Sequence, residues 1–263
     1  IDKKKIFRID HHRCHAAYSY YASNFRKEKI LALTVDGMGD NLNATAGIFD
    51  KKGKYQRLYK TNNCGIARIY RYMTLLLGMK PNEHEYKLMG LAPYGKEKYY
   101  KKPLRVFRET LYVEGTNFKW KNKPSDSYFW FKERLEGVRF DNIASGLQTW
   151  VEELLVKWVK NWIKKTKIKK VVLSGGVALN IKAMGKITEI RDLKDLFIGG
   201  SASDDTLSIG AAFCLAEDLA NKSGKGWDSK NYFPIPNLYL GPKSNYKEEK
   251  KSLKKLDRKK YKI

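Results

Sequence analysis

Three short apolar runs in this 263-residue sequence each end in a glycine-rich polar loop. The runs and the residues that follow them are residues 30–35 before Asp36, residues 171–173 before Ser174 and residues 196–198 before Gly199. Apolar runs of this length, bounded by glycine, are typical of buried strands. In an open α/β sheet, ligands bind at the carboxyl ends of the strands. The sequence therefore predicts an α/β fold with a binding site where three strands end.

The segments between these runs have the patterns of further strands and helices. Residues 43–49 and 55–59 extend the first run into a three-stranded meander. Apolar residues at helical spacing predict a helix over residues 65–78. A longer stripe from Leu147 to Trp162 predicts the clearest helix of the chain, with Asp141 as its N-cap.

Residues 96–140 are aromatic and basic, and their periodicity is weak. We interpret them as an insertion of short helices and loops. Aromatic side chains among lysines can stack nucleobases, but in a folded insertion they more often form its small core. The core is the reading that we favour.

Composition limits the class of protein only in part. The net charge of +25 arises from 53 Lys and Arg against 28 Asp and Glu. Such an excess fits an anionic partner such as nucleic acid, and it fits equally well a surface of solvated lysines. The sequence contains no apolar run of about 20 residues, so we expect no membrane span. Three widely spaced cysteines and no signal peptide favour a cytoplasmic protein.

The histidines near the N-terminus are the strongest chemical signal. His11 and His15 are four residues apart, so a helix places both on one face. Asp204, in the third glycine-rich loop, is the candidate for a further ligand. Two His and one carboxylate are typical of Fe(II) sites and are found with Zn or Mn. The alternative is that three of the four His of the chain are grouped by chance.

Other motifs predict contacts with a phosphate. Glycines in the loop that begins at Asp36 let backbone amides approach an anion, and Asp36 or Asp40 can hold a cation or a water; a plain hairpin turn is the alternative. Lys87 can meet a phosphate and Gly90 allows close approach, although a capped surface helix explains both residues as well. The loop from Ser174 ends at a helix start, which offers backbone amides and a positive dipole end.

Taken together, four motifs resemble one known family. They are residues 11–17, 34–40, 85–95 and 173–180, and they resemble the signature segments of the NodU/CmcH-type O-carbamoyltransferases. These enzymes modify nodulation factors, cephalosporins and aminoglycosides. The resemblance implies the actin-like fold of the sugar kinase/Hsp70 (ASKHA) superfamily, in its Kae1-like version. This fold is an RNase H-like mixed sheet flanked by helices.

The resemblance also implies roles for individual residues. The metal ligands would be His11, His15 and Asp204, with Asp205 disfavoured by its register. The residues implied to bind phosphate and adenosine are Asp36, Gly37, Gly39, Lys87, Gly90, Ser174, Gly175, Gly176 and Asn180.

The implied reaction has two steps. A YrdC-like domain, in cis or in trans, makes carbamoyladenylate from carbamoyl phosphate and ATP. The actin-like part then transfers the carbamoyl group to a hydroxyl of a sugar or natural product. Fe(II) or another divalent ion would act as the Lewis acid.

The resemblance implies a division of the chain. Residues 1–28 would end a first subdomain and residues 29–220 would form the nucleotide-binding subdomain. Residues 221–263 would be a linker and the start of a YrdC-like domain, which residues 237–242 introduce. We therefore expect the middle of a longer enzyme.

Two other functions stay open. One is a threonylcarbamoyl-tRNA-type transferase, which the basic charge suits. That family usually carries Glu-Gly where this chain has Arg13 and Cys14. The other is a non-catalytic nucleotide-binding module.

Overall fold

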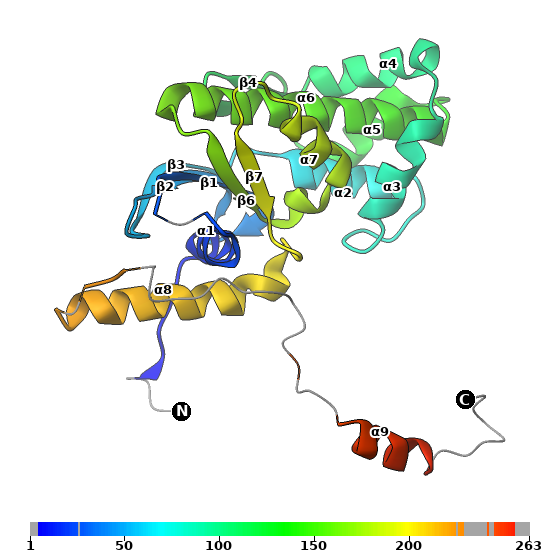
Figure 1. The fold of residues 1–263 in the computed structure, drawn as a ribbon. Coiled ribbons are helices and arrows are strands. Elements are labelled where there is room, and N and C mark those ends of the chain that lie inside the picture. Colours follow the sequence, from blue (N-terminus) through cyan, green and yellow to red (C-terminus); the bar gives the residue numbers. More distant parts are fainter. Residues whose placement is uncertain (1–4, 26, 225, 229–240, 242–244, 256–263) are drawn as a thin grey trace.

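The computed structural model describes residues 5–25, 27–224, 226–228, 241 and 245–255. A five-stranded mixed sheet with the order β3-β2-β1-β6-β7 forms its centre (Figure 1). The strands of this sheet are β1 (Ile30–Gly39), β2 (Leu42–Phe49), β3 (Tyr55–Thr61), β6 (Lys170–Ser174) and β7 (Asp195–Ile198). The central strand β1 pairs antiparallel with β2 and parallel with β6, and β6 pairs parallel with β7. All five strands that the sequence predicts are present.

The helices follow the order that the sequence predicts. They are α1 (His11–Ala22), α2 (Ile66–Leu76), α3 (Glu85–Leu91), α4 (Glu97–Arg108), α5 (Ser127–Leu135), α6 (Phe140–Thr166), α7 (Ile181–Thr188), α8 (Leu207–Lys222) and α9 (Tyr246–Leu253). Three short 3₁₀ turns complete the order, η2 (Ala92–Tyr94), η3 (Gly176–Leu179) and η4 (Asp204–Thr206). None of the described helices is both long and apolar enough to cross a membrane.

The two faces of the sheet face two hydrophobic cores. Successive side chains of a strand point to opposite faces, so Leu31 and Leu33 join the larger core, which includes residues of α2, α6 and α7. Ile30 and Ala32 join the smaller core, which includes residues of α1 and α8. Figure 1 shows α1 and α8 on one side of the sheet and α6 and α7 on the other. This topology of one antiparallel meander followed by parallel strands is RNase H-like, so the predicted fold class is confirmed.

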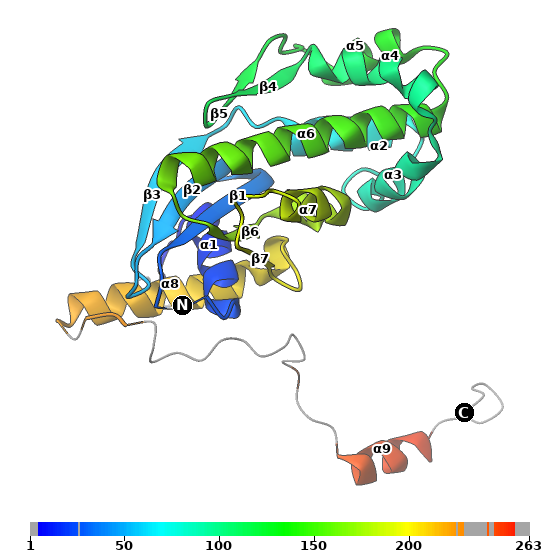
Figure 2. The ribbon, with the colours of Figure 1, turned by 45° about the horizontal axis from the view of Figure 1, so that its top comes forward.

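The segment between α3 and α6 is the predicted insertion, and it packs along α6 (Figure 2). Phe131 is fully buried there, whereas the neighbouring Phe129 is 64% exposed. The insertion also contains a hairpin of β4 (Leu111–Glu114) and β5 (Asn117–Trp120), which the weak periodicity did not reveal. The indole of Trp158 on α6 donates to the Thr116 carbonyl in the turn of that hairpin, at 3.0 Å. The aromatic residues of the insertion thus contribute mainly to its core.

One predicted helix end is wrong. Helix α6 begins at Phe140 and its N-cap is Arg139, not Asp141. The Asp141 carboxylate lies in the first turn, where it accepts the Asn142 amide at 2.8 Å and pairs with Arg139. A carboxylate is stabilised in the first turn of a helix as well as at the cap, so composition alone does not separate the two positions. The domain limits inferred from the resemblance stay a prediction, and residues 237–240 and 242 lie outside the described residues.

Helix α1 is held in place at its N-terminal end and along one side. The Asp10 carboxylate caps it by accepting the Arg13 amide at 2.7 Å. The Arg13 guanidinium donates to Glu217 and Asp218 of α8 at 2.8–3.0 Å. Gly210 of α8 lies so close to α1 that a Cβ there would be 2.0 Å from the Cys14 carbonyl oxygen. The position of α1 therefore depends on a backbone contact that only glycine permits.

Gly210→Ala is expected to destabilise the protein. The new methyl group must push α1 and α8 apart, and strain of this kind costs about 1–3 kcal/mol. Gly185→Ala in α7 is the matched control, because no atom lies within 4 Å of a Cβ at that position. The control is expected to be neutral or stabilising by up to about 1 kcal/mol through helix propensity. Chemical denaturation measures both, and equal stability of the two variants would contradict the contact.

Candidate metal and nucleotide site

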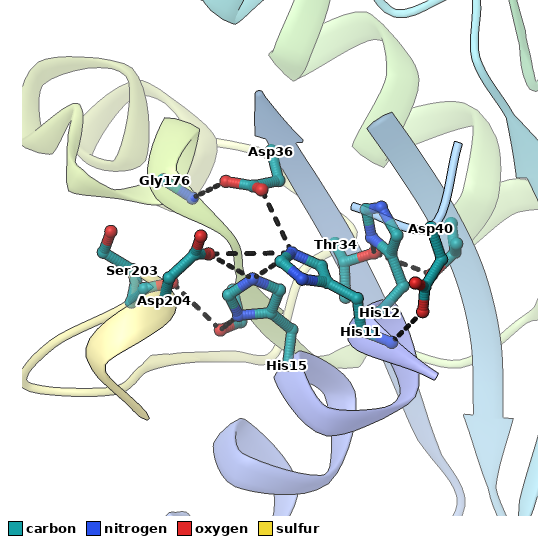
Figure 3. A network of polar contacts seen from close by, with 12 residues as sticks. His11, His12, His15, Thr34, Asp36, Asp40, Gly176, Ser203 and Asp204 are labelled. Atoms are coloured by element: carbon teal, nitrogen blue, oxygen red, sulfur yellow. Dashed lines mark hydrogen bonds and ion pairs between the residues drawn. The ribbon is translucent and has the colours of Figure 1, made fainter. Parts of the chain in front are cut away.

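Four side chains converge where β1 and α1 meet the loop before α8 (Figure 3). They are His11 and His15 of α1, Asp36 of β1 and Asp204 of η4. One ligand atom of each lies within 4.8 Å of those of the other three. The structure thus brings together the three predicted metal ligands and adds Asp36, which the sequence analysis placed with the nucleotide contacts.

The distances among these atoms fit a shared cation. The Nε2 atoms of His11 and His15 are 3.1 Å apart, and the Nε2 atom of His15 is 3.2 Å from an Asp204 carboxylate oxygen. The Nε2 atom of His11 lies 3.2 Å from Asp36 and 3.6 Å from Asp204. Ligand atoms about 2.0–2.2 Å from one ion lie about 3.0–3.5 Å apart when they are adjacent. Two imidazoles and two carboxylates are a donor set for Fe(II), Zn or Mn.

Protonation also favours a cation at this position. Burial opposes the charge of Asp36, but hydrogen bonds from His11 and the Gly176 amide outweigh it and hold the pKa of Asp36 well below its usual range. The hydrogen bond to Asp36 raises the pKa of His11. Burial lowers the pKa of His15 to about 4. At neutral pH Asp36 is therefore charged and His15 offers a lone pair, while a divalent ion competes with a proton at His11.

Neighbouring groups orient Asp36 and His15. The Gly176 amide donates to one Asp36 oxygen at 2.7 Å and leaves the other directed at His11. The Ser174 hydroxyl lies 3.4 Å from the Nδ1 atom of His15. Contacts of this kind to the second ring nitrogen fix the tautomer of a ligating histidine.

Gly39 has no side chain and so leaves space for the imidazole ring of His11. A Cβ on Gly39 would be 2.1 Å from the His11 ring. The amide of His11 itself donates to Asp40 at 2.8 Å. The glycine-rich segment after Val35, predicted as a loop, is the end of β1, which runs to Gly39. It seats the His11 ring, and Asp40 in the turn that follows anchors the start of α1.

His12 connects α1, the helix that carries His11 and His15, to the sheet. Its Nδ1 atom lies 2.8 Å from the Thr34 hydroxyl, which lies 2.7 Å from the Thr45 hydroxyl on β2. All three side chains are fully buried. This chain fixes the rotation of α1 about its axis, so His11 and His15 face the carboxylates.

A cavity of about 840 Å³ opens beside the four side chains. Asp36 and Asp204 line it, so an ion held by them would border the cavity. Further lining residues come from α2, from α3 and the turn before it, and from the junction of η3 and α7. They are Arg68, Tyr70, Arg71, Tyr72, Glu83, Glu85, Tyr86 and Asn180. This volume is within the range of about 300–1,000 Å³ that is usual for small-molecule and cofactor sites.

The predicted nucleotide residues separate into three groups. Asp36, Gly37, Gly176 and Asn180 line the cavity. Ser174, Gly175 and Gly39 lie behind the lining, and Gly175 has a φ of 95° and packs its backbone against Val35. Lys87 and Gly90 are exposed and are not among the lining residues. The capped surface helix, which the sequence left open for α3, describes these two positions better.

Asn180 belongs to a polar network in the cavity wall. Its carboxamide exchanges two hydrogen bonds with that of Gln148, each 2.9 Å long, and it also caps α7 by accepting the Ala183 amide. The Tyr70 hydroxyl donates to Gln148 at 3.1 Å. Gln148 was not predicted, because its position in the apolar stripe of α6 gave no signal. Only the three-dimensional meeting of α2, α6 and η3 reveals it.

The chain matches the model of one protein family. The family model described as carbamoyltransferase N-terminus matches residues 1–213. The chain belongs to this family. The predicted resemblance is thereby confirmed.

Several known proteins are similar to this chain. An uncharacterized protein of Methanocaldococcus jannaschii is 31% identical over 96% of this chain and 44% of the relative. The nodulation protein NolO of Bradyrhizobium diazoefficiens is 25% identical over 89% of this chain and 42% of NolO. The chain thus spans less than half of the length of these relatives. Among solved structures, full-length HypF with phosphate and nucleotide bound is 17% identical, with a TM-score of 0.48, over 85% of this chain and 44% of HypF.

Metal content tests the four-ligand cluster. Protein purified without an affinity metal is expected to hold about one divalent ion per chain by elemental analysis. His15→Ala and Asp204→Asn each remove a proposed ligand. Loss of a group that only supports a ligand lowers metal affinity by about 10–100-fold, so we expect the metal content of both variants to fall by at least about tenfold. Asp205→Asn is the matched control, because Asp205 accepts the Ser201 hydroxyl instead. Equal loss in the Asp204 and Asp205 variants would contradict the cluster.

Proposed function

We propose that this chain is the nucleotide- and metal-binding part of an O-carbamoyltransferase. The enzyme would transfer a carbamoyl group from carbamoyladenylate to a hydroxyl of a sugar or natural product. Carbamoyl phosphate and ATP would supply the carbamoyladenylate through a YrdC-like domain in cis or in trans. Membership of the carbamoyltransferase family supports a transferase, and the finer statements are our proposal.

One observation carries the proposal, namely the four ligand groups at the border of a cavity of nucleotide size. A bound divalent ion would neutralise phosphate charge and polarise the carbamoyl carbonyl. His11, His15, Asp36 and Asp204 would hold it. The open side of such a site faces the cavity, where phosphate oxygens can reach it.

The residues of the chain have distinct tasks in this reaction. Gly176 and Asp36 keep the end of β1 and the loop after β6 together, so the phosphate side of the cavity stays fixed. The hydrogen bonds between Gln148 and Asn180 hold the end of the same segment against α6. The acceptor oxygen attacks the carbamoyl carbon, the bond from that carbon to the phosphate oxygen breaks, and AMP leaves. The hydroxyl proton passes to solvent or to the departing phosphate.

Nucleotide binding is expected to depend on the ion. Chelation should weaken ATP binding at least about tenfold, since charge-assisted contacts to phosphate are lost. Adenosine binding should change little, because adenosine has no phosphate. Calorimetric titration of the metal-loaded and metal-free protein measures both ligands. An equal loss for ATP and adenosine would mean that chelation unfolds the site, and circular dichroism of the same samples detects that.

Turnover separates the proposed function from the two alternatives. With a YrdC-like domain present, carbamoyl-phosphate-dependent release of AMP in the presence of a hydroxyl acceptor supports carbamoyl transfer. Binding of tRNA that weakens steeply with salt, together with threonylcarbamoyl transfer, would favour the tRNA enzyme. Nucleotide binding with no turnover in the complete system would favour a binding module.

A further inference from the structure

Helix α2 presents two arginines to the cavity. Arg68 and Arg71 both line it, and their spacing of three residues places them side by side on the helix surface. Both side chains are exposed. Like charges at this spacing destabilise a helix by about 0.2–0.5 kcal/mol unless an anion offsets them.

Neither guanidinium has a carboxylate partner in the part of the chain that the structure describes. Arg68 lies over the ring of Tyr72 on the same helix, 5.7 Å from its centroid, which restrains its orientation without neutralising it. The other acidic residues that line the cavity already have partners. Glu83 pairs with Lys80, and Glu85 accepts the Asn82 amide at 2.7 Å. The two arginines are therefore available to a ligand.

From this arrangement we infer that Arg68 and Arg71 form a subsite for the carboxylate or phosphate group of an acidic acceptor. The guanidinium group has a planar fork of donors that matches both kinds of anion. This inference rests on the proposed function, in which the ion held by His11, His15 and the two aspartates takes the nucleotide phosphates. Arg68 and Arg71 would then bind the second substrate, which is the acceptor. The acceptor class would be a hydroxyl-bearing sugar acid or sugar phosphate.

Inorganic phosphate is the probe, because it presents the charged group without any assumption about the rest of the acceptor. It is titrated by calorimetry into metal-loaded protein that is already saturated with AMP. Saturable binding of phosphate is expected. The double variant Arg68→Gln and Arg71→Gln is expected to weaken that binding at least tenfold and to keep its metal and its affinity for AMP.

A second double variant controls for charge. Lys102 and Arg105 on α4 are also three residues apart and exposed, and they do not line the cavity. Lys102→Gln with Arg105→Gln removes the same charge and is expected to leave phosphate binding unchanged.

Three results would overturn the inference. One is the absence of phosphate binding in the AMP-saturated wild type, and another is an equal loss in both double variants. The third is a loss of AMP affinity in the Arg68 and Arg71 variant together with competition between AMP and phosphate, which would assign the arginines to the nucleotide. Metal content and AMP binding of the wild type report on the proposed function separately. The inference can thus fail while that function stands.

Discussion

The site depends on the contact between α1 and α8. The four ligand groups come from three segments that are far apart in sequence, and only α1 supplies two of them. Its position is set where Gly210 meets the Cys14 carbonyl, while Arg13 pairs with Glu217 and Asp218 on the same helix. A helix moved by the radius of a methyl group would take both imidazoles away from the carboxylates. The RNase H-like sheet provides the second support, because His12 reaches β1 and β2 through buried hydroxyl groups.

Electrostatics explains why such a cluster favours a cation. Two carboxylates within 4.8 Å repel each other unless positive charge is shared between them. The protein itself supplies only part of that charge, through the Gly176 amide and a proton favoured on His11. The Asp204 side chain is 60% exposed, and its carboxylate lies 3.2 Å from Nε2 of His15 and 3.6 Å from Nε2 of His11. A divalent ion satisfies all four groups at once, so the same contacts that position the side chains also favour the ion.

Sequence predicts the parts of this site that local patterns encode. The spacing of His11 and His15 follows from the helical repeat, and the strand-end loops follow from apolar runs that end in glycine. The sequence leaves open whether Asp36 or Asp40 holds a cation, and only the distance from β1 to α1 shows that Asp36 is the one that lies with His11, His15 and Asp204. The phosphate contact of Lys87 stays a prediction. Its type suits a phosphate, but the rotation of α3 leaves it outside the cavity lining. Side-chain type and order in sequence are local, whereas the face that a helix presents is decided by tertiary packing.

The cavity has two walls of different origin, and this bears on how acceptor choice can change. Asp36 and the loop after β6 belong to the sheet or its strand ends, and His11, His15 and Asp204 come from segments that pack against it, so displacing one strand would disturb the whole cluster. Arg68 and Arg71 lie on the surface of α2, where Arg68 lies over the Tyr72 ring and no described carboxylate pairs with either guanidinium. Substitution there alters the charge presented to a ligand without moving the core residues Ile66, Ile69 and Met73 on the same helix. In the proposed enzyme, acceptor preference would therefore vary on this wall while the chemistry at the strand ends is kept.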